Sequence, residues 1–165
     1  MVIKKFSIRR ATIDDLDDVL VVEKSAFPPH RQGTRETFET RLSLYPKGFF
    51  VVEVDGIIRG FSTALIINNI ISVDKLDIPD NKLHNLQGDV YELRSLAIVK
   101  EFQLRGLGKQ LVNKQLQNAI YFKKKYCRFT ASQDVSRFYE KLGFKQITPY
   151  INFHHAKQAL WERIL

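Results

Sequence analysis

Two features are scarce in this sequence of 165 residues: cysteine occurs once, and long apolar runs are missing. The single cysteine, Cys127, has no partner for an internal disulfide, which fits a reducing compartment. No stretch reaches the roughly 18 apolar residues of a membrane span, and the start Met1-Val2-Ile3-Lys4-Lys5 lacks the apolar region of a signal peptide. We therefore expect a cytoplasmic protein that does not contact a membrane, and we expect no metal site.

The charge balance is strongly basic, with a formal net charge of +8. Such a charge attracts either nucleic acid or a small polyanion such as a nucleotide or coenzyme. The aromatic residues lie mostly on apolar stripes and not among basic residues, so nucleic-acid binding is the weaker alternative. For the run Lys123-Lys124-Lys125, which ends a helical pattern, a solvated helix terminus is favoured and a phosphate contact stays open.

The apolar pattern switches repeatedly between the strand period and the helix period, which predicts a mixed α/β sheet with helices on its faces. The 44% apolar content is that of a globular chain. No repeat or linker is evident, so residues 1–165 are expected to form one domain. Strands are predicted at 6–9, 49–54, 57–67, 91–98, 128–131, 144–148 and 156–164, and helices at 12–27, 34–45, after Gly108 and at 135–142.

Three connections stand out from this pattern. Asp55-Gly56 is a typical type I′ turn and predicts a hairpin between 49–54 and 57–67. The segment Pro28 to Gly33 reads as a loop, in which His30 and Arg31 either line a pocket or belong to the plain surface. The long polar segment 68–89 either reaches over a substrate site or decorates the surface.

The most informative stretch runs from Tyr91 to Gly108, YELRSLAIVKEFQLRGLG. A strand leads into a loop with two glycines and an arginine, and a helix follows at once. Backbone N–H groups at a helix start have no intrahelical partner, and the helix dipole adds positive potential. Gly106 and Gly108 allow close backbone approach. This layout predicts a phosphate-bearing ligand at residues 104–109.

Two motifs together resemble a known family. The loop Gln103-Leu104-Arg105-Gly106-Leu107-Gly108 matches the Q/R-x-x-G-x-G/A loop of the Gcn5-related N-acetyltransferase (GNAT) superfamily, and Phe138 to Phe144, FYEKLGF, looks like its late F-Y-x-K-x-G-F segment. Leu93 to Val99, FYEKLGF and Leu44-Tyr45-Pro46 further resemble the arylalkylamine (serotonin) N-acetyltransferase branch. The resemblance implies a GNAT-like, mostly antiparallel twisted sheet of six to seven strands, flanked by about four helices, with splayed central strands.

The resemblance also implies acetyl-CoA as co-substrate. In that family the strand before the loop offers backbone to pantetheine, and the loop amides bind the pyrophosphate. By position the cofactor-binding residues are Leu96, Ala97, Ile98, Gln103, Leu104, Arg105, Gly106, Leu107, Gly108, Lys109, Ser132 and Phe138. Ser132 departs from the asparagine that many members carry, although it keeps a hydroxyl for a pantetheine contact.

Acetyl transfer needs a base for the amine, because an alkylamine is mostly protonated at neutral pH, and an acid for the leaving thiolate. Glu92 is the candidate base, as the family often uses its position; the alternative is an ordinary strand carboxylate paired with Arg94. Tyr139 is the candidate acid; the alternative is a core aromatic on a helix face. Candidate substrate residues are Phe27, His30, Arg31 and Arg94. Cys127 is expected to be a buried apolar residue and not a nucleophile.

We therefore expect an acetyl-CoA-dependent N-acetyltransferase that acts by direct transfer on a small (aryl)alkylamine or polyamine-like acceptor. A protein lysine or N-terminal amine is the alternative acceptor, and a non-catalytic acyl-CoA-binding module is the alternative function. The arylalkylamine branch carries histidines at the strand positions of Glu92 and Arg94, so its base machinery is not copied here. Whether the chain forms a homodimer stays open.

Overall fold

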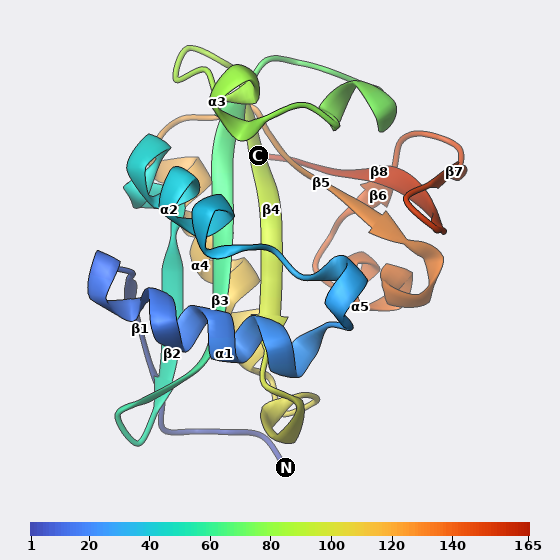
Figure 1. Ribbon diagram of the computed structural model, residues 1–165. Coiled ribbons are helices and arrows are strands. Elements are labelled where there is room, and N and C mark those ends of the chain that lie inside the picture. Colours follow the sequence, from blue (N-terminus) through green and yellow to red (C-terminus); the bar gives the residue numbers. More distant parts are fainter. The chain divides into compact units, whose positions relative to one another are not determined.

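The protein, represented by a computed structural model, is described over all residues from Met1 to Leu165 (Figure 1). Its main elements in chain order are β1 (Ser7–Arg10), α1 (Leu16–Ala26), α2 (Arg35–Leu44), β2 (Phe50–Val54), β3 (Ile57–Ile67), α3 (Asp80–Leu83), β4 (Val90–Ile98), α4 (Leu107–Tyr121), β5 (Tyr126–Ser132), α5 (Ser136–Glu140), β6 (Lys145–Gln146), β7 (Ile151–Phe153) and β8 (Ala156–Ile164). Short 3₁₀ turns precede or join several of these elements.

The strands form one sheet of eight, in the order β1-β2-β3-β4-β5-β8-β6, with β7 paired to β8. The β1–β2, β2–β3, β5–β8, β6–β8 and β7–β8 pairs are antiparallel, and β4–β5 is parallel. This confirms the predicted GNAT-like fold. The strand count is higher than expected because the three residues of β7 are too few to show a sequence period. The strand predicted at 144–148 is only Lys145–Gln146.

Strands β4 and β5 pair over a short stretch of the second unit. The pairing of β4 with β5 covers only Val90↔Tyr126, Tyr91↔Cys127 and Glu92↔Arg128. Beyond this point β5 continues to Ser132 in pairing with β8.

The chain divides into two compact units. The first unit contains Met1–Ala64 and Ser95–Asn118, and the second contains Leu65–Arg94 and Ala119–Leu165. Strands β3 and β4 and helix α4 each contribute residues to both.

In the first unit, α1 and α2 cover one face of β2 and β3 (Figure 1). Alternation along β2 explains this layering. Phe49 and Val51 join the cluster under α1 and α2, whereas Phe50 and Val52 pack with Leu107 and with Leu111 of α4 on the other face. Both faces of this sheet are therefore covered, as the two-sided apolar pattern predicted.

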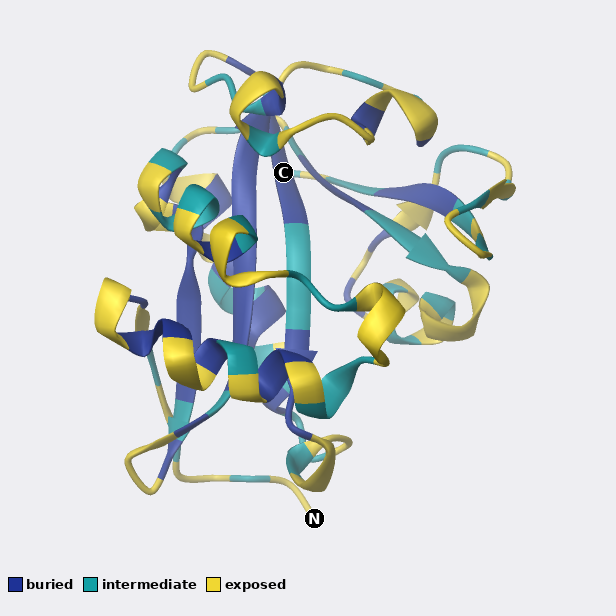
Figure 2. Cartoon of the chain, in the orientation of Figure 1, coloured by how far each residue is buried: buried dark blue, intermediate teal, exposed yellow.

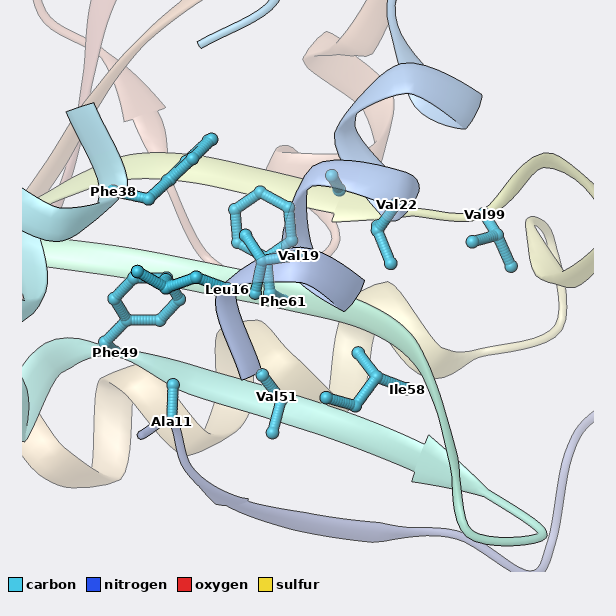
Figure 3. Close-up of a cluster of buried hydrophobic side chains, with 11 residues drawn as sticks. Ala11, Leu16, Val19, Val22, Phe38, Phe49, Val51, Ile58, Phe61 and Val99 are labelled. Carbon is cyan, nitrogen blue, oxygen red and sulfur yellow. The ribbon is translucent and has the colours of Figure 1, made fainter. Parts of the chain in front are cut away.

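The core under α1 and α2 is rich in aromatic rings. Phe38 packs edge-on against Phe61 with ring centroids 5.1 Å apart, and Phe49 lies 6.0 Å from Phe61. Leu16 and Val19 of α1 pack into the same cluster (Figure 3). Figure 2 shows the resulting pattern, with buried residues on β2 and β3 and exposed ones on the outer side of α1. This core fixes the helices that carry the α1–α2 connection.

The hairpin turn between β2 and β3 is confirmed. Asp55 and Gly56 both have positive φ, 53° and 75°, as a type I′ turn requires. The pairing runs from Val54↔Ile57 outward, with one irregularity between Val52 and Glu53.

In the second unit, β5 and β8 pair along their length, from Tyr126↔Ile164 to Ser132↔Gln158. Phe129 on β5 lies at the centre of an aromatic group, with ring centroids 4.9 Å from Phe144 and 6.4 Å from Trp161. Cys127 is completely buried, as predicted, and burial raises the pKa of its thiol.

The segment 68–89 is fastened to the second unit by side chains from several elements. It contains α3 and a 3₁₀ turn at Asp74–Leu76. Five basic side chains hold it, through the contacts Arg128–Asn69, His154–Asp77, Arg94–Asp80, Lys124 with the carbonyls of Leu86 and Gly88, and Lys125–Asp89. Lys123 and Lys125 are exposed, as expected for a solvated helix terminus, whereas Lys124 is half-buried against the two carbonyls.

Candidate active site

The predicted phosphate loop lies between the end of β4 and the start of α4 in the first unit. Helix α4 begins at Leu107, so the last glycine of the motif lies in its first turn. The first hydrogen bond of the helix runs from the Gln110 amide to the Gly106 carbonyl at 3.2 Å. The amides of residues 107–109 precede this bond, so they are available to an anion, as predicted.

The loop has the backbone conformation that its glycine implies. Gly106 has a φ of +92°, which side-chain-bearing residues rarely adopt. Leu104 is also left-handed, with a φ of 59°, and its side chain is fully exposed. The Arg105 carbonyl accepts a 3.0 Å hydrogen bond from the Ile3 amide, so the first residues of the chain brace the loop.

Two arginines approach one aromatic ring beside this loop. The Arg105 guanidinium lies 5.3 Å from the Phe102 ring centroid, and that of Arg59 lies 4.5 Å from it. Arg105 belongs to the predicted set, but Arg59 on β3 does not. Because Arg59 lies far from the loop along the chain, no local pattern indicates this contact.

The predicted pantetheine strand is buried toward its end. Leu96 is half-buried, and Ala97 and Ile98 are buried. Gly60 on β3 faces the Ala97 carbonyl so closely that an added Cβ would lie 2.8 Å from that oxygen. This close packing holds the strand from the β3 side.

The candidate base, Glu92, lies in the second unit and is almost completely buried. Its Oε1 accepts a 3.1 Å hydrogen bond from Arg94, and Arg94 also donates to Asp80 at 3.0 Å. Burial raises the pKa of Glu92, and the neighbouring Arg94 opposes this shift. The predicted pairing with Arg94 is therefore present, and Glu92 Oε2 has no hydrogen-bond partner.

The candidate acid, Tyr139, lies on α5 of the second unit. Its ring packs against Phe129 at 3.8 Å between centroids and against Phe138 at 4.9 Å. The surroundings raise the pKa of its phenol through burial. No hydrogen bond within the chain engages the hydroxyl, so the structure combines the predicted aromatic packing with a free donor. Ser132 instead binds Asp134 through its hydroxyl.

The candidate substrate residues fall in different places. Phe27 packs against the aromatic core of the first unit, and the Arg31 guanidinium lies 5.7 Å from its ring centroid. His30 is exposed in the same connection. Arg94, in the second unit, binds Glu92 and Asp80 through Nη1 and Nη2, while its Nε has no hydrogen-bond partner.

A family model described as an acetyltransferase (GNAT) domain matches residues 46–146, which is more than half of the chain. This chain belongs to the GNAT acetyltransferase family. The matched range contains both motifs, the candidate base and the candidate acid. GNAT domains use acetyl-CoA, so the predicted co-substrate and the acyltransferase class are confirmed for this family member.

Two relatives are similar in sequence to this chain over most of its length. An uncharacterized N-acetyltransferase of Methanocaldococcus jannaschii is 28% identical over 157 residues, covering 87% of this chain and 62% of the relative. The chain thus spans less than two thirds of that relative. An N-alpha-acetyltransferase of Sulfurisphaera tokodaii is 25% identical over 148 residues, covering 87% of this chain and 83% of the relative.

Solved structures share the GNAT fold over nearly the whole chain. The loading GNATL domain of CurA from Lyngbya majuscula has a TM-score of 0.83 and 20% identity, with 98% of both chains covered. The GNAT-like decarboxylase GphF, in complex with isobutyryl-CoA, has a TM-score of 0.78 and 18% identity, covering 96% of this chain and 98% of GphF. These likenesses confirm the fold.

Within the first unit, sequence analysis missed a polar group beside the GNAT pantetheine strand. Arg41 of α2 donates a 2.6 Å hydrogen bond to Ser95 on β4 and a 3.3 Å bond to Thr63 on β3. Glu23 of α1 is buried, accepts from the Gly33 amide at 3.0 Å, and leaves Oε2 without a partner. Burial raises the pKa of Glu23, and the positive charge of Arg41 opposes the shift.

One sequence signal could have found this group. Glu23 lies next to Val22 on the buried side of α1, and a carboxylate there interrupts an otherwise apolar stripe. A buried charge at such a position needs a partner or a function. Arg41, by contrast, sits on a mostly polar helix and gives no comparable signal.

Two further features of the GNAT chain lie away from these residues. A hollow of about 460 Å³ at the β7–β8 turn is lined by Asn152–Lys157 alone and contains none of the candidate residues. No cluster of metal-binding side chains is present. None of the helices has the length and apolar character needed to cross a membrane.

Proposed function

We propose that this chain transfers the acetyl group of acetyl-CoA directly to a primary amine, and that residues 1–165 form a single N-acetyltransferase domain. The observation that carries the proposal is the loop from Gln103 to Lys109. It joins the end of β4 to free amides at the start of α4, with Gly106 in a glycine conformation. Such a start of a helix binds a pyrophosphate.

In the proposed reaction, the backbone of Leu96 and Ala97 binds the pantetheine and polarises the thioester carbonyl. Glu92 removes a proton from the ammonium, directly or through water, because a protonated amine cannot attack. The raised pKa of this buried carboxyl brings its proton affinity nearer to that of an amine. Tyr139 donates its phenolic proton to the leaving thiolate, since no other group in the chain holds that hydroxyl.

The first candidate acceptor is a small (aryl)alkylamine or polyamine-like molecule. This choice rests on the resemblance of residues 93–99 and 138–144 to the arylalkylamine N-acetyltransferase branch. A second candidate is the α-amine at the start of a polypeptide. The N-alpha-acetyltransferase relative, 25% identical over most of both chains, supports this second class. Either acceptor presents one primary amine to the same base, so the chemistry is shared.

The test is an acceptor panel with acetyl-CoA as donor. Coenzyme A release would be followed with a thiol-reactive chromophore, and acetylated products identified by mass spectrometry, for alkylamines, arylalkylamines, polyamines and short peptides with free or blocked N-termini. We expect thiol release with at least one primary amine and none with blocked peptides. The Glu92→Gln variant serves as the matched control.

Two outcomes would contradict the proposal. Calorimetric binding of acetyl-CoA with no thiol release across the panel would indicate a binding module. Absence of any binding would remove coenzyme recognition altogether.

A further inference from the structure

Arg94 is shared between two carboxylates in the second unit. Its Nη1 lies 3.1 Å from Glu92 Oε1, and its Nη2 lies 3.0 Å from Asp80 Oδ1. Glu92 and Arg94 are two positions apart on β4 and so point to the same face. Asp80 is the first residue of α3, within the segment 68–89. One guanidinium thus links that segment to the candidate base.

The three side chains are shielded from water. The exposed fractions are 18% for Arg94, 2% for Glu92 and 9% for Asp80. Charges interact more strongly when solvent does not screen them. One positive charge between two negative charges cannot fully neutralise both, so each carboxylate affects how strongly Arg94 stabilises the other.

Arg128 is the other charged group on this face, and its donors are bound to side chains other than Glu92. Arg128 on β5 is in register with Glu92, but its Nε and Nη2 bind Glu162 at 2.6 Å and its Nη1 binds Asn69 at 2.6 Å. The buried thiol of Cys127 on β5 is a further titratable neighbour, and burial raises its pKa. Arg94 is therefore the only cation that donates a hydrogen bond to Glu92.

We propose that Asp80 is a positioning residue for Glu92. Through the shared Arg94 guanidinium, Asp80 holds the Glu92 carboxylate in place. The charge of Asp80 also limits how strongly Arg94 stabilises ionised Glu92, which keeps Glu92 able to take a proton. This inference rests on the proposed function, in which Glu92 is the base. Asp80 touches neither the amine nor the coenzyme in this role. The role of segment 68–89 is then to deliver this carboxylate.

The other contacts of segment 68–89 hold it independently of Asp80, so Asp80 can be substituted without releasing the segment. Asn69, Asp77, the carbonyls of Leu86 and Gly88, and Asp89 are each held by other basic side chains. The substitution Asp80→Asn keeps an oxygen that accepts from Arg94 Nη2 and removes only the charge. The segment is thus expected to stay in place.

The test compares pH–rate profiles of kcat/KM for the full chain and for Asp80→Asn. Without the Asp80 charge, Arg94 stabilises ionised Glu92 more strongly, so we expect the acid limb to move to lower pH. On the limb, the variant would then exceed the wild-type chain several-fold, whereas its rate at the plateau would fall because the base binds its proton less strongly.

The matched control is Asp77→Asn, which removes a different carboxylate of the same segment, the one bound by His154. Its acid limb is expected to coincide with that of the wild type. If both variants shift the limb equally, or if Asp80→Asn leaves it unchanged or moves it to higher pH, the inference is overturned.

A second measurement does not depend on activity. The carboxyl ¹³C resonance of Glu92, assigned by its absence in Glu92→Gln, would be titrated in both chains, with Asp80→Ser as a second variant if Asp80→Asn does not fold. A lower midpoint in the variant supports the inference, and an equal or higher midpoint overturns it. If Glu92→Gln keeps full activity, the base assignment fails, but this titration still decides whether Asp80 controls the proton affinity of Glu92 through Arg94.

Discussion

The side-chain amide of Gln103 donates a 2.9 Å hydrogen bond to the backbone carbonyl of Ile98. This bond crosses the 3₁₀ turn Lys100–Phe102 and closes the connection between β4 and α4. The glutamine that opens the loop motif therefore shapes the loop from inside. It joins the predicted pantetheine strand to the predicted pyrophosphate loop.

Gln103→Ala is expected to weaken acetyl-CoA binding by removing this bond. A hydrogen bond of about 0.5–1.5 kcal/mol corresponds to a roughly two- to ten-fold higher Kd. Isothermal calorimetry with acetyl-CoA measures the change. Gln117→Ala, at an exposed position on α4, is the control and should leave Kd unchanged; equal affinities for all three chains would show that the bond does not shape the site.

Gly106→Ala should cost both stability and affinity, because a Cβ is disfavoured at a φ of +92° and the loop amides must approach the pyrophosphate closely. The strain of a left-handed residue is about 1–2 kcal/mol. Gly56→Ala, at a φ of +75° in the β2–β3 turn, carries comparable strain away from the loop. Chemical denaturation should show similar losses for both variants, and calorimetry a loss of acetyl-CoA affinity only for Gly106→Ala. Equal affinities of the two variants would contradict the role of the loop.

Tyr139→Phe is expected to lower kcat by about ten-fold or more, since general acids typically contribute at least this much. The ring packing against Phe129 and Phe138 is retained, and the hydroxyl has no partner to lose, so the melting temperature and the acetyl-CoA Kd should not change. Steady-state kinetics and thermal denaturation measure these effects. Tyr121→Phe, with a side chain 77% exposed, is the control. A kcat equal to that of the wild type would assign Tyr139 to packing alone.

Glu92→Gln should remove the acid limb of the kcat/KM profile. Burial raises the pKa of Glu92, so in the wild-type chain activity should rise with pH over a range above that of an ordinary glutamate. The base works only when ionised, hence the rate increases as pH rises through its pKa. Stopped assays across the pH range, at constant ionic strength, measure the profile. If the Glu92→Gln variant keeps the same acid limb, a group other than Glu92 is responsible for that limb.

Glu23→Gln should change the stability of the chain in a way that depends on pH. The pKa of Glu23 is raised in the folded chain through burial, so its contribution to stability is full below the pKa of the unfolded chain and is lost as pH rises through the folded value. Glutamine still accepts from the Gly33 amide but carries no charge. The melting temperature of the variant relative to wild type should therefore increase from acid to neutral pH. Glu36→Gln, at an exposed position on α2, should show no such trend, and a parallel pair of curves for Glu23→Gln would contradict the assigned cause.

Local patterns predicted most of the elements. The Asp55-Gly56 turn, the strand from Tyr91 and the helix after the glycine loop follow from short-range preferences, and the structure places them within one or two residues of expectation. The short β7 was not predicted and β6 was predicted too long, because so few residues carry no period. Helix α5 is also shorter than its apolar stripe suggested, as its first residues form a 3₁₀ turn.

By itself, the sequence determined the fold class, the layout of strand, glycine loop and helix start, and the family, because these three pieces adjoin in the chain and follow from short-range backbone preferences. It left open whether Glu92 is an ordinary paired carboxylate and what segment 68–89 does. Only the tertiary structure decided that Arg94 joins Glu92 to Asp80, and that Arg41 reaches Ser95. The Arg94–Asp80 contact links residues 14 positions apart, and the Arg41–Ser95 contact links residues 54 positions apart. Burial then sets the strength of these contacts, because solvent screens buried charged groups less than exposed ones.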